Sequence, residues 1–362
     1  MTSGKQSAYV YAGVARWGGG GSQSAKPGTL GGVFRMPVEG GAWRHMMTGF
    51  PEVVHVHCIT VHPSASNIIF AGAHDGVYRS EDHGETWMRL ASATLADQIW
   101  SIAISPHDDA TIFAGASPTS VHKSVDGGAT WRRMASASIP DRLPMGSFKN
   151  RVMRIAVNPK DPLRIFAALE VNGAMASDDG GDTWRDCGDD LVRLSRNPEL
   201  RSSILTKDDA EGMLDAHALT LLPDDGTTVY LANRMGLFHS RDDGRTWLNL
   251  DVGRFSPLTY ARDVRASLCE PDTLYACVSV SSNGETGSIV RSADRGRTWA
   301  RFDHGVTPGS TAMAVAQHPE CAEIVHFIAR KGEVFGSLDA GHTWRARPLP
   351  SGCEGAYCIA CG

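Results

Sequence analysis

The sequence lacks the features of several large classes of protein. Its 35 Lys and Arg residues face 40 Asp and Glu residues, for a formal net charge of -5, so the electrostatic footprint of a nucleic-acid-binding protein is missing. No apolar run reaches the roughly 18 residues of a membrane-spanning helix. The opening segment MTSGKQSAYVYAG has no positively charged stretch followed by an apolar core. No secretory leader is visible in it, and we expect a cytoplasmic location unless a leader precedes this sequence.

Cysteine is sparse and scattered. The eight cysteines stand at positions 58, 187, 269, 277, 321, 353, 358 and 361. Most lie alone in apolar segments, which favours small buried side chains in a reducing compartment over a disulfide framework. Cys358 and Cys361 form a Cys-x-x-Cys pair, but residues three apart on a strand point to opposite faces, and no matching second pair exists. We therefore expect neither redox chemistry nor metal binding from them.

What the sequence does contain is a repeat. The pattern Ser-x-Asp-x-Gly-x-Thr-Trp occurs six times, as SEDHGETW (80–87), SVDGGATW (124–131), SDDGGDTW (177–184), SRDDGRTW (240–247), SADRGRTW (292–299) and SLDAGHTW (337–344). The closing tryptophans are 44, 53, 63, 52 and 45 residues apart. A catalytic motif is seldom copied six times in one chain, whereas a structural unit is, so we interpret the motif as structural.

The same four short segments surround each copy of the motif. In HCITVHPSASNIIFAGAHDGVYRSEDHGETWMRL (57–90), a first run ends at a proline turn, IIFAGA and GVYRS come next, and WMRL comes after the motif. Four short alternating runs separated by turn signals predict a four-stranded antiparallel sheet. Repeats of about 40–50 residues with four strands each are typical of propeller blades.

A seventh, degenerate copy precedes the first motif. GGVFRMPVEGGAWRHM (31–46) aligns with DGVYRSEDHGETWMRL and keeps Trp43, while SAYVYAG (7–13) matches a second strand. Its missing innermost strand is supplied by GAYCIACG (355–362). We therefore predict an all-β fold in which residues 1–362 form one seven-bladed β-propeller of four-stranded antiparallel blades. The last blade is closed by the C-terminal strand together with the N-terminal strands.

The six motifs resemble the Asp-box, or BNR, repeat of the sialidase-like propellers, and the resemblance covers nearly the whole chain. It says less about function, since the same box occurs in sialidases, xyloglucan-cleaving glucanases, sortilin-type receptors and photosystem II assembly factors. In this family the innermost strand runs from the top face to the bottom face, which implies motifs at the bottom and ligand sites at the top mouth. VFRMP (33–37) is similar to a carboxylate-binding motif of sialidases, but the repeat alignment sends it to the bottom face.

The starts of the innermost strands would line that mouth. Alignment gives one set of equivalent residues: His57, Trp100, Met153, His217, Arg262, Met313 and Tyr357. Two residues earlier, on the same face of each strand, stand His55, Gln98, Arg151, Asp215, Tyr260, Thr311 and Gly355. Buried polar groups cost free energy unless they are paired, so these sets indicate either a ligand site or a hydrated channel.

Loops on the same face add charged groups. Turns between second and third strands, and a Gly-rich loop, supply His74, Asp75, Glu170, Asn172, Arg234, Arg330, Arg16 and Trp17. Arginine suits carboxylates, sulfates and phosphates, which predicts an anionic or polyhydroxylated ligand, unless these arginines only neutralise nearby carboxylates. The long loops 133–150 and 186–213 lie there too, and Asn197-Pro198-Glu199 predicts the start of a short helix over the mouth.

From these residues we expect a hydrolase or lyase acting on a polar, anionic small molecule or carbohydrate at the top mouth. Glycosidase-like general acid/base chemistry, which needs paired carboxyl groups, is favoured. The candidate catalytic residues are Asp215, His217, His57 and Glu170. The candidate ligand-binding residues are Arg151, Arg154, Arg262, Trp100, Tyr357, Arg234 and His55.

Two alternatives stay open. No cofactor is certain, but a divalent metal could be held by His55, His57 and His217, because imidazole suits such ions. The other alternative is a non-catalytic propeller that binds or assembles proteins. The sequence does not indicate an oligomeric state.

Overall fold

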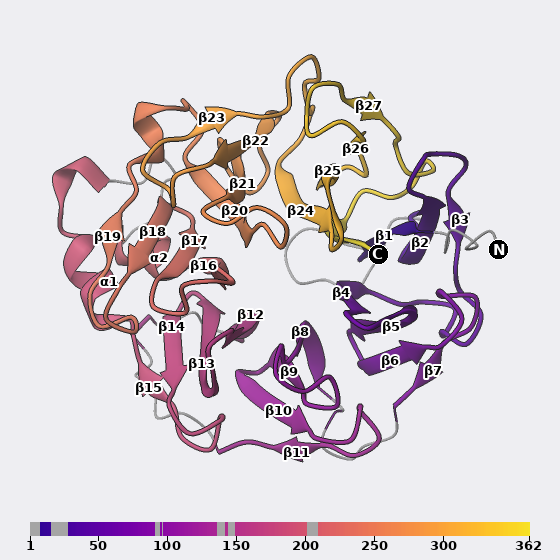
Figure 1. The fold of residues 1–362 in the computed structure, drawn as a ribbon, viewed down its shortest axis with the longest axis horizontal. Helices are drawn as coiled ribbons and strands as arrows, with labels where there is room; N and C mark the ends of the chain where they lie inside the picture. The colour runs from indigo at the N-terminus through magenta and orange to yellow at the C-terminus, as the bar shows by residue number, and fades with distance from the viewer. Residues whose placement is uncertain are drawn as a thin grey trace.

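Seven four-stranded antiparallel sheets surround a central axis (Figure 1) in the computed structural model, which describes residues 8–15, 28–90, 95, 97–135, 142–143, 149–200 and 209–362. Blades 1 to 6 use their strands in chain order. Their innermost strands are β4 (Val56–His62), β8 (Gln98–Ile104), β12 (Arg151–Asn158), β16 (Ala216–Leu221), β20 (Tyr260–Ala266) and β24 (Ala312–His318).

The remaining strands of these six blades are arranged outward from the axis. The second strands are β5 (Ala65–Ala73), β9 (Ile112–Ser117), β13 (Asp161–Glu170), β17 (Val229–Asn233), β21 (Leu274–Ser279) and β25 (Cys321–Ala329). The third strands are β6 (Gly76–Ser80), β10 (Ser120–Ser124), β14 (Gly173–Ser177), β18 (Gly236–Ser240), β22 (Gly287–Ser292) and β26 (Val334–Ser337). The outermost strands have two residues each: β7 (Met88–Arg89), β11 (Arg132–Arg133), β15 (Arg185–Asp186), β19 (Leu248–Asn249), β23 (Ala300–Arg301) and β27 (Arg345–Ala346).

The seventh blade joins the two ends of the chain, which confirms the predicted closure. C-terminal β28 (Ala356–Cys361) pairs antiparallel with β1 (Tyr9–Val14), and β2 (Gly32–Pro37) and β3 (Arg44–His45) lie further outward. In Figure 1 the C-terminus lies beside β1, between blade 6 and blade 1. The seventh blade therefore holds the two ends of the chain in one sheet, and opening the ring there requires breaking the β1–β28 ladder.

Apolar side chains fill the space between neighbouring blades. One buried cluster, for example, combines Val10 and Val14 of the closing blade with Ala314 and Ile328 of blade 6. The tryptophans that end the repeated motifs join these clusters, and five of the six are no more than 9% exposed: Trp87, Trp131, Trp247, Trp299 and Trp344. Each of these five rings thus buries a large aromatic area between two sheets.

The repeated motif is a hydrogen-bonded turn between the third and fourth strands. In 124–131 the Ser124 hydroxyl donates to Asp126 Oδ1 at 2.8 Å, and the Thr130 N–H donates to the same oxygen at 2.8 Å. Hydrogen bonds from Thr130 hold the pKa of the Asp126 carboxyl down at about 2. The motif is structural, because its Asp side chain accepts hydrogen bonds from residues of the same turn.

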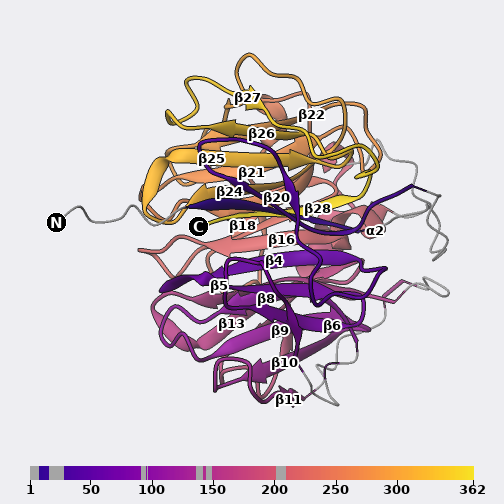
Figure 2. The same ribbon diagram turned by 90° about the vertical axis from the view of Figure 1, so that its right-hand side faces the viewer.

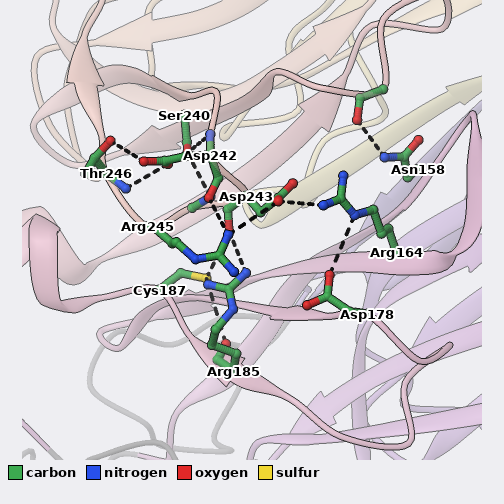
Figure 3. Close-up of polar contacts among 12 residues, drawn as sticks. Asn158, Arg164, Asp178, Arg185, Cys187, Ser240, Asp242, Asp243, Arg245 and Thr246 are labelled. Atoms are coloured by element: carbon green, nitrogen blue, oxygen red, sulfur yellow. Dashed lines mark hydrogen bonds and ion pairs between the residues drawn. The ribbon is translucent and has the colours of Figure 1, made fainter.

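The motifs also tie neighbouring blades together, as Figure 3 shows for blade 4. Asp242 binds Ser240 and Thr246 within the turn, while the next residue, Asp243, pairs with Arg164 of blade 3 at 2.6 Å. At the closing seam, Arg35 of VFRMP donates to the His83 carbonyl of blade 1 at 2.7 Å. Arg35 therefore serves the bottom face, as the repeat alignment indicates, and not the mouth.

The insertion 186–213 contains the short helix α1 (Asp189–Leu194) and all but the last residue of the short helix α2 (Asp209–Leu214). The helix predicted to begin at Pro198 is only a single 3-10 turn, η1 (Pro198–Leu200), closed by the Leu200 N–H donating to the Asn197 carbonyl. Proline's fixed φ starts the turn, but the α-helices form on either side of it. A second 3-10 turn, η2 (Val252–Arg254), comes after β19. Residues 201–208, and the predicted mouth residues Arg16 and Trp17, lie outside the described residues.

Figure 2 shows the blades edge-on, with α2 on one face and the C-terminal end of β28 toward the other. Because β28 is an innermost strand that runs toward the bottom, α2 lies on the top face. Asp215 directly follows the last turn of α2. Its N–H donates to the Glu211 carbonyl at 2.9 Å and so extends the hydrogen bonding of that turn.

Candidate functional site

Each innermost strand carries a β-bulge at an equivalent position, one or two residues after its top end begins to pair. The ladder to the neighbouring strand skips one residue there in all seven blades. The skipped residues are His57, Trp100, Met153, His217, Arg262, Met313 and Tyr357, which are the seven that the alignment made equivalent. A bulge re-aims a side chain out of the ladder, so we define this ring of seven as the mouth.

The aromatic side of the mouth spans blades 7, 1 and 2. The imidazole of His57 stacks on the indole of Trp100, with ring centroids 3.8 Å apart, and Tyr357 meets both rings edge-on. His57 Nδ1–H donates to the Ile99 carbonyl at 3.1 Å. Burial lowers the pKa of His57 to about 3, so the ring stays neutral near pH 7 and is a poor base. His57 is better explained as a structural residue that joins blades 1 and 2 by stacking and a hydrogen bond than as a catalytic residue.

On the opposite side of the mouth, Asp215 and Arg234 lie next to His217. Arg234 donates to Asp215 Oδ2 through Nη2 at 2.6 Å and through Nε at 2.9 Å, and its Nη1 reaches Glu211 at 3.0 Å. Although burial opposes a charge, His217 and Arg234 hold the pKa of the Asp215 carboxyl well below its usual range. Asp215 is therefore a fixed carboxylate, which is the reverse of what a general acid needs.

The two ring nitrogens of His217 face three oxygen atoms. Its Nδ1–H donates to the Ala261 carbonyl at 2.8 Å, which leaves Nε2 facing Asp215 Oδ2 at 3.3 Å and the Tyr260 hydroxyl at 3.4 Å. Burial raises the pKa of Tyr260 to about 12, so the phenol keeps its proton. Tyr260 was among the aligned residues, but no sequence pattern distinguished it from them, because its partner His217 belongs to the neighbouring blade.

Glu170 and Arg262 lie between these two sides. Arg151 Nη1 approaches Glu170 Oε2 to 2.9 Å, and its guanidinium carbon lies 4.0 Å from the Trp100 ring centroid. The ion pair lacks hydrogen-bond geometry at Oε2, so the charges are paired while that oxygen keeps an unused lone pair. Arg262 forms no hydrogen bond or ion pair with the described residues; its guanidinium lies 6.0 Å from the Tyr357 ring. Burial opposes its charge, but Tyr260, Glu170 and Tyr357 raise the pKa of Arg262.

A second tier of charge lies deeper along the axis. Arg154 extends from blade 3 past blade 4 to blade 5, where its Nη2 lies 3.0 Å from Asp263 Oδ1. Arg265 pairs with the other oxygen of Asp263 at 3.1 Å. Arg154 was predicted to bind ligand at the mouth, and the structure places it in this lower tier. Asp263 and Arg265 were not predicted, although their alternation on one strand was a usable signal.

The three histidines considered as metal ligands do not form one group. The His55 N–H donates to His74 Nδ1 at 3.2 Å, and the two rings lie 5.0 Å apart on blade 1, beside His57. His217 lies in blade 4. Within the described ranges, no cluster of three or more His, Cys, Asp or Glu side chains is arranged to hold a metal ion. No helix among those residues is long and apolar enough to cross a membrane.

Comparison with known proteins agrees with the fold. A family model, Sortilin-Vps10 (sortilin, neurotensin receptor 3), matches residues 75–219, which is less than half of the chain. The GH74 xyloglucanase from Xanthomonas campestris has a TM-score of 0.60 and 17% identity over 80% of this chain. The GH74 enzyme of Niastella koreensis has a TM-score of 0.59 and 18% identity over 81% of it.

This chain spans 45% of the length of both GH74 structures. YCF48 from Cyanidioschyzon merolae is closer in size, with a TM-score of 0.56 and 15% identity over 85% of this chain and 88% of its own. No curated protein matches the sequence. Likeness at such low identity shows a seven-bladed propeller and leaves the function to be argued from the site.

Proposed function

We propose that the mouth binds a polar ligand carrying an anionic group, with Arg262 as its principal contact. The observation that carries the proposal is that Arg262 differs from the other arginines of this face. Arg151 pairs with Glu170, Arg234 pairs with Asp215 and Glu211, and Arg330 contacts Ser282 and Asn283. Arg262 has no such partner among the described residues, and a guanidinium is suited to carboxylate, sulfate or phosphate groups.

The surroundings of Arg262 favour a ligand with an apolar face or ring as well as a charge. Tyr357, Trp100 and His57 form the aromatic side of the mouth next to it. Aromatic rings provide a flat contact surface for the ligand, while the arginine fixes its orientation. A sugar acid or another cyclic acid combines both properties.

Glycosidase chemistry by Asp215 and Glu170 is the weaker hypothesis for a reaction of the bound ligand. A glycosidase needs one carboxylic acid that keeps its proton near neutral pH. Both candidates here are paired with arginines, and the pKa of Asp215 is held low. The second candidate function is a lyase or hydrolase in which His217 moves a proton. It is favoured by the position of His217 Nε2 between the Tyr260 phenol and the Asp215 carboxylate.

Calorimetry and thermal denaturation with matched ligands test the proposal. Glucuronate, galacturonate, acetate and phosphate are compared with neutral glucose, using the wild type, Arg262→Gln and Arg297→Gln. Arg297 is an exposed arginine of the repeated motif in blade 5, so its variant makes the same charge change away from the mouth. A ligand at about 100 times its Kd raises the free energy of unfolding by about 2.7 kcal/mol.

We expect uronates to bind the wild type and Arg297→Gln, and to bind Arg262→Gln at least about tenfold more weakly, since a charge-assisted hydrogen bond is lost. Equal affinity for glucuronate and glucose, or an unchanged Arg262→Gln, would contradict the proposal. Release of reducing ends or unsaturated products from anionic oligosaccharides, monitored with the same three proteins, separates catalysis from binding alone.

A further inference from the structure

The lower tier of the axis holds two arginines that share a single carboxylate. Arg154 and Arg265 contact opposite oxygens of Asp263, at 3.0 and 3.1 Å. Among the described residues Asp263 is the only acidic partner of either guanidinium. Asp263 is itself fully buried, and its Oδ2 also accepts the Val315 N–H at 3.2 Å. The three side chains together therefore carry one positive charge in excess.

The remaining neighbours do not neutralise that charge. Cys58, Cys277 and Cys358 are titratable groups close to both arginines, and burial raises the pKa of each thiol, to about 12 for Cys58. The three thiols therefore stay neutral. Burial and the neighbouring Arg265 lower the pKa of Arg154 to about 10, which shows that its charge is poorly compensated. Its Nε atom is buried and has no hydrogen-bond partner among the described residues.

Both arginines keep surface that a ligand can contact. The side chain of Arg154 is 23% exposed and that of Arg265 is 39% exposed. Arg265 stands three residues after Arg262 on β20, which corresponds to roughly 10 Å along a strand. The same strand thus carries the unpaired arginine of the mouth and one arginine of the tier below it.

We propose that the ligand carries two anionic groups, one held at the mouth by Arg262 and the other held between Arg154 and Arg265. The inference rests on the proposed function, because it extends the anion site of the mouth to a second contact point. Asp263 positions the two lower guanidiniums and neutralises only one of their two positive charges. A chain or ring that spans about 7–10 Å between its anionic groups fits this two-tier arrangement.

A length series of linear α,ω-dicarboxylates, from succinate to suberate, measures the spacing directly. Each dicarboxylate is titrated into the full-length protein by calorimetry in a chloride-poor buffer, beside the monocarboxylate with the same number of carbons. Diphosphate and phosphate form a second pair of probes. The proteins are the wild type, Arg265→Gln, Asp263→Asn and the surface control Arg297→Gln, and thermal denaturation verifies that each is folded.

The wild type is expected to bind one dicarboxylate length at least about tenfold more tightly than its monocarboxylate. Arg265→Gln should lose this preference and keep the affinity for monocarboxylates. The Asp263→Asn variant should show a greater preference for the dicarboxylate and bind it several-fold more tightly than the wild type does. The substitution removes a competing negative charge, while the Asn side chain still accepts a hydrogen bond. Arg297→Gln should behave as the wild type.

The outcomes separate the two proposals. If monocarboxylates bind through Arg262 but no dicarboxylate or diphosphate binds more tightly, the second anionic group is refuted and the proposed function stands. An Arg265→Gln variant that keeps the full dicarboxylate preference also refutes it. If no anion binds the wild type, the proposed function itself fails, and the two-tier inference fails with it.

Discussion

Replacing Arg234 by glutamine tests how the mouth is held together. Asp215 is only 4% exposed, and Arg234 supplies two of the three donor contacts to its Oδ2, at 2.6 and 2.9 Å. The third contact comes from His217 at 3.3 Å. Glutamine keeps most of the side-chain length but removes the charge. The variant therefore leaves a buried carboxylate with only a histidine to balance it.

The expected loss is large for a single substitution. Removing one partner of a buried ion pair typically costs about 3–5 kcal/mol, because the other charge stays buried and uncompensated. His217 remains beside Asp215, so we expect the lower end of that range, about 3 kcal/mol at pH 7. Arg132→Gln is the matched control. Its ion pair with Asp182 is more than half exposed on both sides, so its loss should be no more than about 1 kcal/mol.

The pH dependence of the stability should also change. In the wild type the pKa of Asp215 is lowered, so its stabilising contribution is present above about pH 4 and is lost as the pH falls through its folded-state value. Without Arg234 only His217 opposes the effect of burial, so the pKa of the carboxyl rises relative to the wild type. The variant is then penalised more as the pH rises from about 4 to 7, since its buried carboxyl must ionise.

Urea unfolding monitored by tryptophan fluorescence at pH 5 and pH 8 measures both effects. We expect the deficit of Arg234→Gln relative to the wild type to be greater at pH 8 than at pH 5. A deficit below about 1 kcal/mol at pH 7, or the same deficit at both pH values, would refute the description of Asp215 as a buried carboxylate that needs Arg234 in addition to His217.

Two further predictions concern the repeated motif. Ala340 has a φ of 55° in a position where two other copies have glycine, so Ala340→Gly should raise the free energy of unfolding by up to about 1 kcal/mol, whereas Ala300→Gly on β23 should lower it. Equal effects of the two in urea unfolding would contradict this. Thr130 lowers the pKa of Asp126 to about 2, and Asp179 and Asp339 are shifted likewise. The stability that these turns contribute should be complete above about pH 4 and be lost toward pH 2. Asp126→Asn should weaken this acid-dependent part, as monitored by near-UV circular dichroism. An unfolding midpoint that is the same at pH 6 and pH 3 would argue against the prediction.

The blade pattern could be predicted because it depends on local sequence. Each copy of the motif closes its own turn, as Ser124, Asp126 and Thr130 do within one short stretch of chain. Strand periodicity and turn residues then recur at the same offsets, so the equivalent positions on all innermost strands are found by alignment. His57, Trp100, His217, Arg262 and Tyr357 are bulge residues for the same local reason. Repetition also pointed to the missing strand of the seventh blade, which β28 supplies.

The pairing of side chains around the axis could not be predicted in this way. Arg154 passes blade 4 to reach Asp263, and His217 meets Tyr260 of the next blade. Such contacts join residues far apart in the chain, and they depend on how closely the closed ring brings its innermost strands together. The glycosidase hypothesis was weakened for that reason, because composition identified Asp215 and Glu170 as acids but not the arginines that neutralise them.

The sequence by itself determined the number of blades, their order and the set of residues that face the mouth, because repeats and strand alternation are properties of neighbouring residues. Only the tertiary structure decided which charges are already paired and which are not. Arg151, Arg234 and Arg262 look alike in the sequence, yet Arg262 alone of the three has no acidic partner among the described residues. Charge balance is a three-dimensional property, since it depends on distances between side chains that different blades bring together around one axis.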